Sequence, residues 1–344
     1  MSIDTLFKKA AEKNASDIHL IVGMSPVFRI DGKLTPQTDE PVVNDKTAES
    51  MIYGLMSERQ KTIFDETKEL DLSYEIGETA RFRVNVHQEK GNIGLVARII
   101  PTKIPTMEEL QMPQIVFDLI SLNQGLILVT GPTGCGKSTT LASIINHINN
   151  ERSEHIVTLE DPIEFIFKSN KSIIKQRQLH TDMVNFNNAL IHVLRQDPNV
   201  IMVGEMRDLE TIATTITLAE TGHLVFATLH THNSAQTVDR IIDIFPSHQQ
   251  AQIRLQLSMT LKGIISQRLI PKQGGGRIAT REILVNTPAI SNLIRENKIA
   301  QIKTVVQTSA DEGMFTMDQD LTRLQKENLI DKETLEFNLS VPTK

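Results

Sequence analysis

The residues whose chemistry is clearest lie in one glycine-rich run. This run fits the pattern G-x-x-x-x-G-K-[ST] at every position and consists of Gly131, Pro132, Thr133, Gly134, Cys135, Gly136, Lys137 and Ser138, with Thr139 after it. Glycines let successive backbone N–H groups turn towards one anion. In such loops the lysine reaches the β- and γ-phosphates of a nucleotide, and the Ser138 hydroxyl is offered to Mg²⁺. The run therefore predicts a phosphate-binding loop for ATP and Mg²⁺.

Two elements must hold this loop in place. Residues 126–129 are apolar and are bounded by Gly125 and Gly131, which is typical of a buried strand in a parallel sheet. Residues 139–148 contain few helix breakers and carry apolar side chains at helical spacing. A strand, a glycine loop and a helix in this order place the positive end of the helix dipole at the loop. The flanking elements therefore favour a phosphate site over an ordinary glycine-rich turn.

Three carboxylates follow the next predicted strand, residues 156–159. They are Glu160, Asp161 and Glu164. Ligands of parallel sheets bind at the carboxyl ends of the strands, where these acids lie. One carboxylate there could orient an attacking water, and another, Asp161, could hold Mg²⁺. A polar turn without a ligand is the alternative, and the nearby phosphate loop argues against it.

Another acid ends a second apolar strand. Residues 200–203 are apolar, and Gly204 and Glu205 follow them. This is the form of a Walker B element, in which a rigid strand aims a carboxylate at Mg²⁺. Glu205 stands where aspartate is commoner, and its longer side chain suits contact through a water molecule. We therefore expect Glu205 to complete the Mg²⁺ site.

Three histidines, His223, His230 and His232, surround the apolar run 224–229. Zinc binding is one interpretation, but no cysteine or suitably placed acid completes a ligand set. Ordinary core or loop histidines are a second interpretation. We favour a third, in which these histidines sense the nucleotide or relay its state to a neighbouring subunit.

Several arginines lie on one predicted sheet face. Alternation of polar and apolar residues places Arg81, Arg83, Asn85 and His87 on the same side of a strand, and Arg98 lies on the returning strand. A solvated sheet face is the simpler interpretation. The other is an arginine supplied to a triphosphate, a contribution of about 10³–10⁵ in rate in other NTPases.

Composition narrows the class of protein. The chain has 344 residues, enough for about two domains. A net charge of −6, two tyrosines and no tryptophan disfavour nucleic acid as a partner. No window approaches 18 uninterrupted apolar residues and the N-terminus has no apolar signal segment, so we expect a cytoplasmic protein. The single cysteine, Cys135, excludes an internal disulfide and a multi-cysteine metal site.

The patterns along the chain indicate two domains. Residues 1–100 have the short helices and strands of a small α+β domain. Prolines at 101 and 105 suit a linker, which we place at 101–112 with a short helix at 106–110. Over 113–344 strands and helices alternate as in a doubly wound α/β fold with a parallel sheet. Within it we expect a helix at 249–264, a strand at 266–270 and a mostly helical part from about residue 288.

Four segments in order carry a resemblance to a known family. The phosphate loop, TLEDPIEF (158–165), VIMVGEMRD (200–208) and TGHLVFATLHTHNS (221–234) resemble the Walker A, Asp box, Walker B and His box of type II/IV secretion ATPases. The segments ASDIHL (15–20) and RIDGKL (29–34) resemble the N-terminal domain of that family. SQRL (266–269) and AISNLIRE (289–296) resemble the C-terminal part of its pilus-retraction branch. The resemblance extends along nearly the whole chain.

This resemblance implies a PAS-like N-terminal domain, a RecA-like ATPase core and a ring-shaped homohexamer, with ATP and Mg²⁺ bound between the two domains. It also implies a motor that drives pilus retraction from the cytoplasmic face of the inner membrane. Such a motor acts on a pilus platform protein and has only peripheral contact with the membrane complex. By position the resemblance makes Glu164 the general base, Glu205 the Walker B acid, His223 and His230 the His-box residues, and Arg81, Arg83 and Arg98 the candidates for phosphate-facing arginines.

Two positions depart from the family pattern. Cys135 stands where serine is usual, so we expect affinity to be retained and thiol modification to block the site. Ser291 interrupts the usual run of the retraction branch. Other interpretations are an accessory retraction ATPase of the same branch, and a pilus assembly or type II secretion ATPase, which usually carries a four-cysteine zinc module. A non-catalytic nucleotide-gated scaffold and a nucleic-acid motor complete the alternatives.

Overall fold

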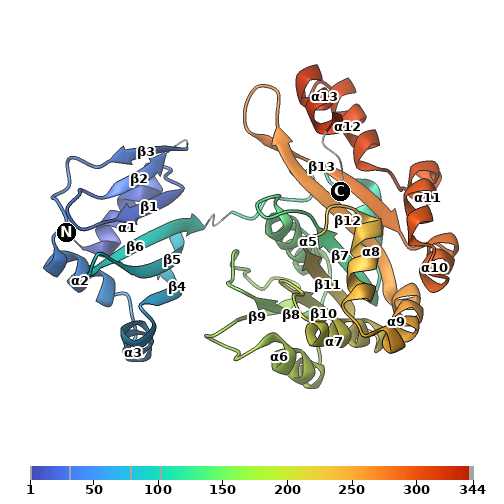
Figure 1. Ribbon diagram of the computed structural model, residues 1–344, viewed down its shortest axis with the longest axis horizontal. Helices are drawn as coiled ribbons and strands as arrows, with labels where there is room; N and C mark the ends of the chain where they lie inside the picture. The colour runs from blue at the N-terminus through green and yellow to red at the C-terminus, as the bar shows by residue number, and fades with distance from the viewer. Residues whose placement is uncertain (1, 31, 78–79, 101–102, 341–344) are drawn as a thin grey trace. The chain divides into compact units, whose positions relative to one another are not determined.

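The computed structural model describes residues 2–30, 32–77, 80–100 and 103–340, and in it the chain divides into two units, Met1–Lys103 and Ile104–Lys344 (Figure 1). Residues 101 and 102 of the expected linker lie outside the described residues. Within the described parts of the chain, no helix is both long and apolar enough to cross a bilayer.

Unit 1 is built on a six-stranded antiparallel sheet with the order β3-β2-β1-β6-β5-β4. Three alternate residues of β5, Phe82, Val84 and Val86, are fully buried, as the alternation in the sequence predicts. Phe7 packs on Phe82 with ring centroids 4.3 Å apart. The elements are α1 (Ile3–Glu12), β1 (Asp17–Leu20), β2 (Val27–Ile30), β3 (Lys33–Pro36), α2 (Asp45–Tyr53), α3 (Glu58–Thr67), β4 (Glu69–Ile76), β5 (Ala80–Glu89) and β6 (Asn92–Ile100).

Unit 2 is an α/β layered structure around a seven-stranded sheet with the order β13-β12-β7-β11-β10-β8-β9. All neighbouring strands are parallel except the edge pair β12 and β13. Its strands are β7 (Gly125–Thr130), β8 (His155–Glu160), β9 (Ile173–Gln178), β10 (Val200–Val203), β11 (Leu224–Leu229), β12 (Leu261–Pro271) and β13 (Arg277–Val285). The central strands β7, β10 and β11 are buried along their whole length and consist mostly of apolar residues, which explains the apolar runs of the sequence.

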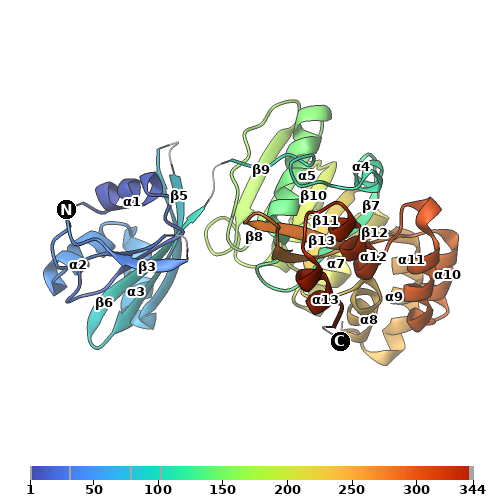
Figure 2. The ribbon, with the colours of Figure 1, turned by 90° about the horizontal axis from the view of Figure 1, so that it is seen from above.

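Helices cover both faces of this sheet. Leu126 and Leu128 of β7 belong to a core shared with α6 to α9, whereas Ile127 and Val129 belong to one shared with α4 and α5. The C-terminal helices, red in Figures 1 and 2, extend these layers: α10 lies against α9, α11 against α8, and α12 against β13. The helices of unit 2 are α4 (Gln114–Ile120), α5 (Lys137–Glu151), α6 (Phe186–Val193), α7 (Leu209–Glu220), α8 (Ser234–Asp243), α9 (Ser247–Thr260), α10 (Pro288–Arg295), α11 (Ile302–Thr308), α12 (Met317–Lys326) and α13 (Lys332–Ser340).

The helix predicted at 106–110 is wrong, because this segment is only a turn. The Thr106 hydroxyl accepts from the Glu109 N–H at 3.1 Å, as in a helix start. The turn then closes at once: Gln111 has a φ of 50°, and the Met112 N–H donates to the Met107 carbonyl at 2.9 Å. The hydrogen bond typical of a helix N-cap is therefore present, but no helix follows it.

The helix predicted at 249–264 is also wrong in its last residues. The helix α9 ends at Thr260, and β12 begins at Leu261. Ile264 and Ile265 pair in parallel with Leu128 and Val129 of β7. A Cβ on Gly263 would lie 2.7 Å from a Leu119 methyl and 3.1 Å from the Leu284 carbonyl oxygen, so glycine suits the close packing at this point. Pairing with β7 thus overrides the helical pattern.

Candidate functional site

The phosphate loop connects β7 to α5 at the carboxyl edge of the central strands. Three of its residues, Gly131, Gly134 and Gly136, have φ values of 144°, 78° and 89°. Gly131 is sterically required, because a Cβ on it would lie 2.3 Å from the carbonyl oxygen of Gln267. No side chain caps the start of α5, where Gly136 is the N-cap residue. The first N–H groups of α5, which include those of Ser138 and Thr139, are thus available to an anion at the loop.

Lys137 lies over the loop that precedes it. Its Nζ donates to the carbonyl oxygens of Gly131 at 2.7 Å and Pro132 at 3.1 Å. Burial lowers the pKa of Lys137, and the nearby carboxylates Glu205 and Glu164 act in the opposite direction. Both acids are therefore within electrostatic range of the lysine.

Glu205 is held in place by two side chains. Its Oε1 lies 2.8 Å from His230 Nε2, and its Oε2 lies 2.8 Å from a terminal nitrogen of Arg207. Burial alone would raise the pKa of Glu205, but the hydrogen bond and charge of Arg207, together with His230, keep it below the ordinary value. Glu205 is thus a carboxylate, the form that a metal ligand needs.

His230 joins this acid to the phosphate-loop lysine. Its Nδ1 lies 3.4 Å from Lys137 Nζ. An ammonium has no acceptor, so Nδ1 must be the accepting nitrogen, and Nε2–H then donates to Glu205. Lys137, His230, Glu205 and Arg207 therefore form one continuous row of polar contacts beside the loop.

The three acids after β8 have different surroundings. Glu160 is buried and accepts from the Thr158 hydroxyl at 2.6 Å and from Gln176 Nε2 at 3.0 Å. Burial raises the pKa of Glu160 in spite of these donors. Asp161 is exposed. Glu164 is half-buried, and its negative charge acts to raise the pKa of Lys137. Glu160 is therefore a structural carboxyl group, whereas Asp161 and Glu164 remain open to a ligand.

His223 does not join this site. It precedes β11, whereas His230 follows it, and the two residues lie at opposite ends of a strand paired with β7. The Nδ1 of His223 lies 3.0 Å from the Leu218 carbonyl oxygen. Within the described residues no three His, Cys, Asp or Glu side chains gather in a way that could hold a metal ion.

Cys135 is buried within the loop. Burial raises the pKa of its thiol, although Lys137 acts in the opposite direction. The nucleophilic form of a cysteine is the thiolate, so this environment disfavours the thiol modification that the sequence suggested.

The three candidate arginines belong to unit 1. Arg81 is buried and its Nη1 lies 2.6 Å from Glu75 Oε1. Arg98 pairs with Asp17 at 2.9 Å. Arg83 is exposed and lies opposite Arg98 in the register of β5 and β6. Arg83 and Arg98 therefore share one face of this sheet.

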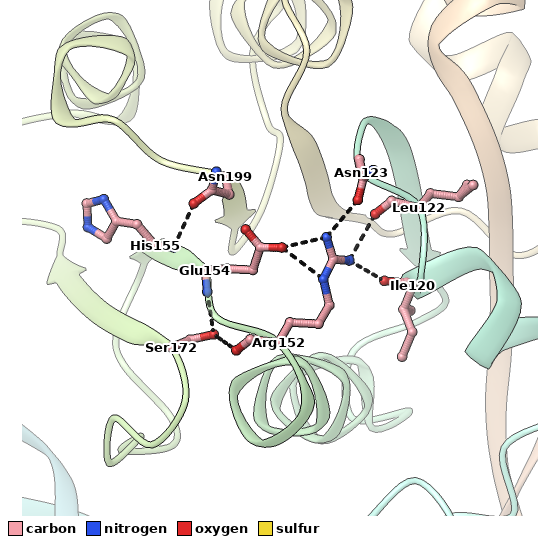
Figure 3. Close-up of polar contacts among 8 residues, drawn as sticks. All are labelled: Ile120, Leu122, Asn123, Arg152, Glu154, His155, Ser172 and Asn199. Carbon is pink, nitrogen blue, oxygen red and sulfur yellow. Dashed lines mark hydrogen bonds and ion pairs between the residues drawn. The ribbon is translucent and has the colours of Figure 1, made fainter.

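The far end of α5 is fixed by Arg152, which follows the helix (Figure 3). Its guanidinium donates to Glu154 Oε1 at 2.8 and 3.0 Å and to Asn123 Oδ1 at 3.1 Å. It also donates to the carbonyl oxygens of Ile120 at 2.9 Å and Leu122 at 3.0 Å. Ile120, Leu122 and Asn123 precede β7, so these contacts tie the end of α5 to the start of the strand that carries the loop.

Two side chains beside the loop, Arg207 and Gln267, have no distinguishing pattern in the sequence. Arg207 lies within the Walker B segment, but its contact with Glu205 has no signal beyond a spacing of two residues. Gln267 reaches the loop from β12, more than 120 residues further along the chain. No local pattern could have revealed this contact, because it depends on the order of strands in the sheet.

Known proteins with similar sequences and structures give the site a context. Residues 1–275 match the family described as "Type II/IV secretion system protein". The chain is 46% identical over 342 residues to the type IV pilus retraction ATPase PilT of Pseudomonas aeruginosa, and the match covers 99% of each chain. It is 45% identical over 333 residues to a twitching motility protein of Neisseria gonorrhoeae, covering 96% of this chain and 89% of the relative. A crystal structure of the pilus retraction motor PilT with bound ADP matches with a TM-score of 0.94 at 46% identity, covering 99% of this chain and 98% of that one.

Proposed function

This chain belongs to the type II/IV secretion ATPase family, and on that premise we propose that it is a motor that hydrolyses ATP to power retraction of a type IV pilus. The observation that carries the proposal is the row formed by Lys137, His230 and Glu205 beside the phosphate loop. Similarity to two retraction proteins along nearly the full chain supports the direction of the motor.

Nucleotide binding starts from the loop 131–139. Its backbone N–H groups and the start of α5 attract the phosphates. Lys137 exchanges the carbonyl oxygens of Gly131 and Pro132 for β- and γ-phosphate oxygens, which are stronger partners because they are charged. The lysine is thus held beside the site before the nucleotide arrives.

Oxygen donors suited to Mg²⁺ are present at the end of this loop and after the strands β8 and β10. Hard cations prefer hydroxyl and carboxylate oxygens, and Ser138, Asp161 and the ionised Glu205 supply them. We propose that Ser138 and Glu205 hold Mg²⁺, with Asp161 as a further ligand. When bound, the ion neutralises charge on the phosphates. Arg207 and His230 would keep Glu205 ionised and oriented for that role.

Glu164 is the proposed general base. Its charge acts on the pKa of Lys137. Glu164 is only half-buried, so water has access to its carboxylate. A carboxylate there accepts a proton from the water that attacks the γ-phosphate. Arg81, Arg83, Arg98 and the His-box residue His223 remain proposed contributors in the assembled motor.

We also propose a homohexameric assembly, in keeping with the motor function. It works at the cytoplasmic face of the inner membrane on the pilus platform protein, with peripheral contact only and without nucleic acid. Sedimentation of the purified chain with and without nucleotide tests this assembly. A strictly monomeric protein under both conditions contradicts it.

The substitution Glu164→Gln tests the chemistry. It preserves side-chain size but removes the base, so we expect ATP affinity to stay within about threefold and turnover to fall about 10²–10⁴-fold. Calorimetric titration with ATP and a phosphate-release assay measure the two effects. Glu333→Gln, an exposed change on α13, is the control and should resemble the unsubstituted chain. Equal turnover in the Glu164 variant would remove this assignment.

A further inference from the structure

Gln267 of β12 contacts the phosphate loop and the helix after it with one side chain. Its Nε2 donates to the Cys135 carbonyl oxygen at 2.7 Å, and its Oε1 accepts from the Thr140 hydroxyl at 2.9 Å. Gln267 is 1% exposed. The orientation of the carboxamide is fixed by its partners, because the Cys135 carbonyl can only accept.

The backbone beside Gln267 also meets the loop. A Cβ on Gly131 would lie only 2.3 Å from the Gln267 carbonyl oxygen. A Cβ on Gly136 would lie 3.3 Å from Gln267 Nε2. Ser266 precedes it and is paired with Thr130, the last residue of β7, with their hydroxyl oxygens 2.8 Å apart. The pair Ser266 and Gln267 therefore contacts the loop at its beginning and at its end.

We propose that Gln267 is a positioning residue for the phosphate loop, an inference that rests on the proposed ATP function. The peptide between Cys135 and Gly136 is planar and trans, so its C=O and N–H point in opposite directions. Gln267 binds the carbonyl oxygen and so directs the Gly136 N–H away from itself. In a phosphate loop the backbone N–H groups are the ligands of the anion. Gln267 thus sets the orientation of a phosphate-binding amide before the nucleotide arrives.

The contact with Thr140 adds a second constraint. Thr140 lies in the first turn of α5 and is 2% exposed. One carboxamide therefore links the loop to the start of the helix whose dipole faces the phosphates. Water cannot replace a lost partner easily at a buried site, so removing the carboxamide leaves the Cys135 carbonyl unsatisfied and free to turn.

The experiment compares two changes of similar size at opposite ends of β12. Gln267→Met removes the carboxamide at the loop. Asn286→Leu removes a similar carboxamide, whose Nδ2 donates to the carbonyl oxygens of Ser258 and Leu261 at the other end of β12. Both changes cost stability, but only the first acts on the loop. ATP affinity by calorimetry, KM and kcat, and hydrogen exchange of residues 131–136 are measured for each variant.

We expect Gln267→Met to weaken ATP binding roughly tenfold or more, because it loses two buried hydrogen bonds that orient the loop. KM should rise by a similar factor, kcat should change less than about threefold, and the loop amides should exchange faster. Asn286→Leu should leave affinity, KM and loop exchange as in the unsubstituted chain. Equal affinity and equal loop exchange in the two variants would overturn the inference.

A substitute variant and the ATP binding of the unsubstituted chain separate the remaining outcomes. If Gln267→Met does not fold, Thr140→Val is measured in its place, because it removes one of the two contacts and leaves Gln267 intact. It should weaken ATP binding by a smaller factor than expected for Gln267→Met, and affinity equal to that of Asn286→Leu would then overturn the inference. If the unsubstituted chain itself fails to bind ATP, the proposed function fails, which is a separate outcome.

Discussion

At the scale of single residues, the site depends on charges whose states follow from their neighbours. Glu205 is ionised because Arg207 and His230 offset its burial, whereas Glu160, on the adjacent strand, has only neutral donors. Two acids that the sequence places in similar positions therefore have opposite pKa shifts. The sequence shows which acids end the strands, but burial decides which of them is suited to bind a metal.

Glu160 gives a pH prediction. Burial raises its pKa above the ordinary 4.5, so the folded chain binds this proton more tightly than the unfolded chain does. The stability from this group is complete below pH 4.5 and is lost as pH rises through the raised pKa. Glu160→Gln should therefore show a smaller fall in the thermal midpoint between pH 5 and pH 8, measured by circular dichroism. An identical pH dependence in the variant and the unsubstituted chain would show that Glu160 is not responsible.

At the scale of elements, the unit formed by β7, the loop and α5 was predictable, because each part has a strong local pattern. The edge strand β9 was not expected, since Ile173–Gln178 contains only two apolar residues and pairs on one side only. The start of β12 was missed because Leu261–Ile264 continues a helical pattern that pairing with β7 overrides. Local signals fail here where sheet pairing determines the conformation.

Arg152 gives a stability prediction at this scale. Its half-buried guanidinium joins the end of α5 to Glu154 and to carbonyls that precede β7 (Figure 3). Arg152→Met leaves these groups without a donor and should lower the free energy of unfolding by about 1–3 kcal/mol. Lys171→Met is the matched control, because its ion pair with Glu151 is exposed and should contribute less than about 1 kcal/mol. Urea unfolding measures both, and equal losses would contradict the role of Arg152.

At the scale of the whole molecule, the family resemblance was carried by four motifs in order, and the match over residues 1–275 bears it out. The α/β core with a parallel sheet could likewise be predicted, because buried strands and amphipathic helices alternate. The contact of Gln267 with the loop could not, because it joins segments whose proximity follows from the order of strands in the folded sheet. The contact of Arg207 with Glu205 could not either, because a spacing of two residues does not by itself indicate an ion pair.

The direction of the proposed motor is tested in cells. A retraction motor removes pili, so deletion of the gene should increase the number of surface pili and abolish twitching. Electron microscopy and a surface-motility assay measure these effects. Restoring the gene should reverse both, whereas restoring it with Glu164→Gln should not. Cells without pili would instead indicate an assembly motor.

The central claim is that the loop 131–139 holds a triphosphate that this chain cleaves. The most direct measurement is ATP binding and phosphate release by the purified chain with Mg²⁺, beside Lys137→Ala as the reference. We expect saturable binding and steady turnover in the unsubstituted chain, with both lost in the variant because the lysine contact with the phosphates is gone. A folded, unsubstituted chain that neither binds nor hydrolyses ATP would contradict the account.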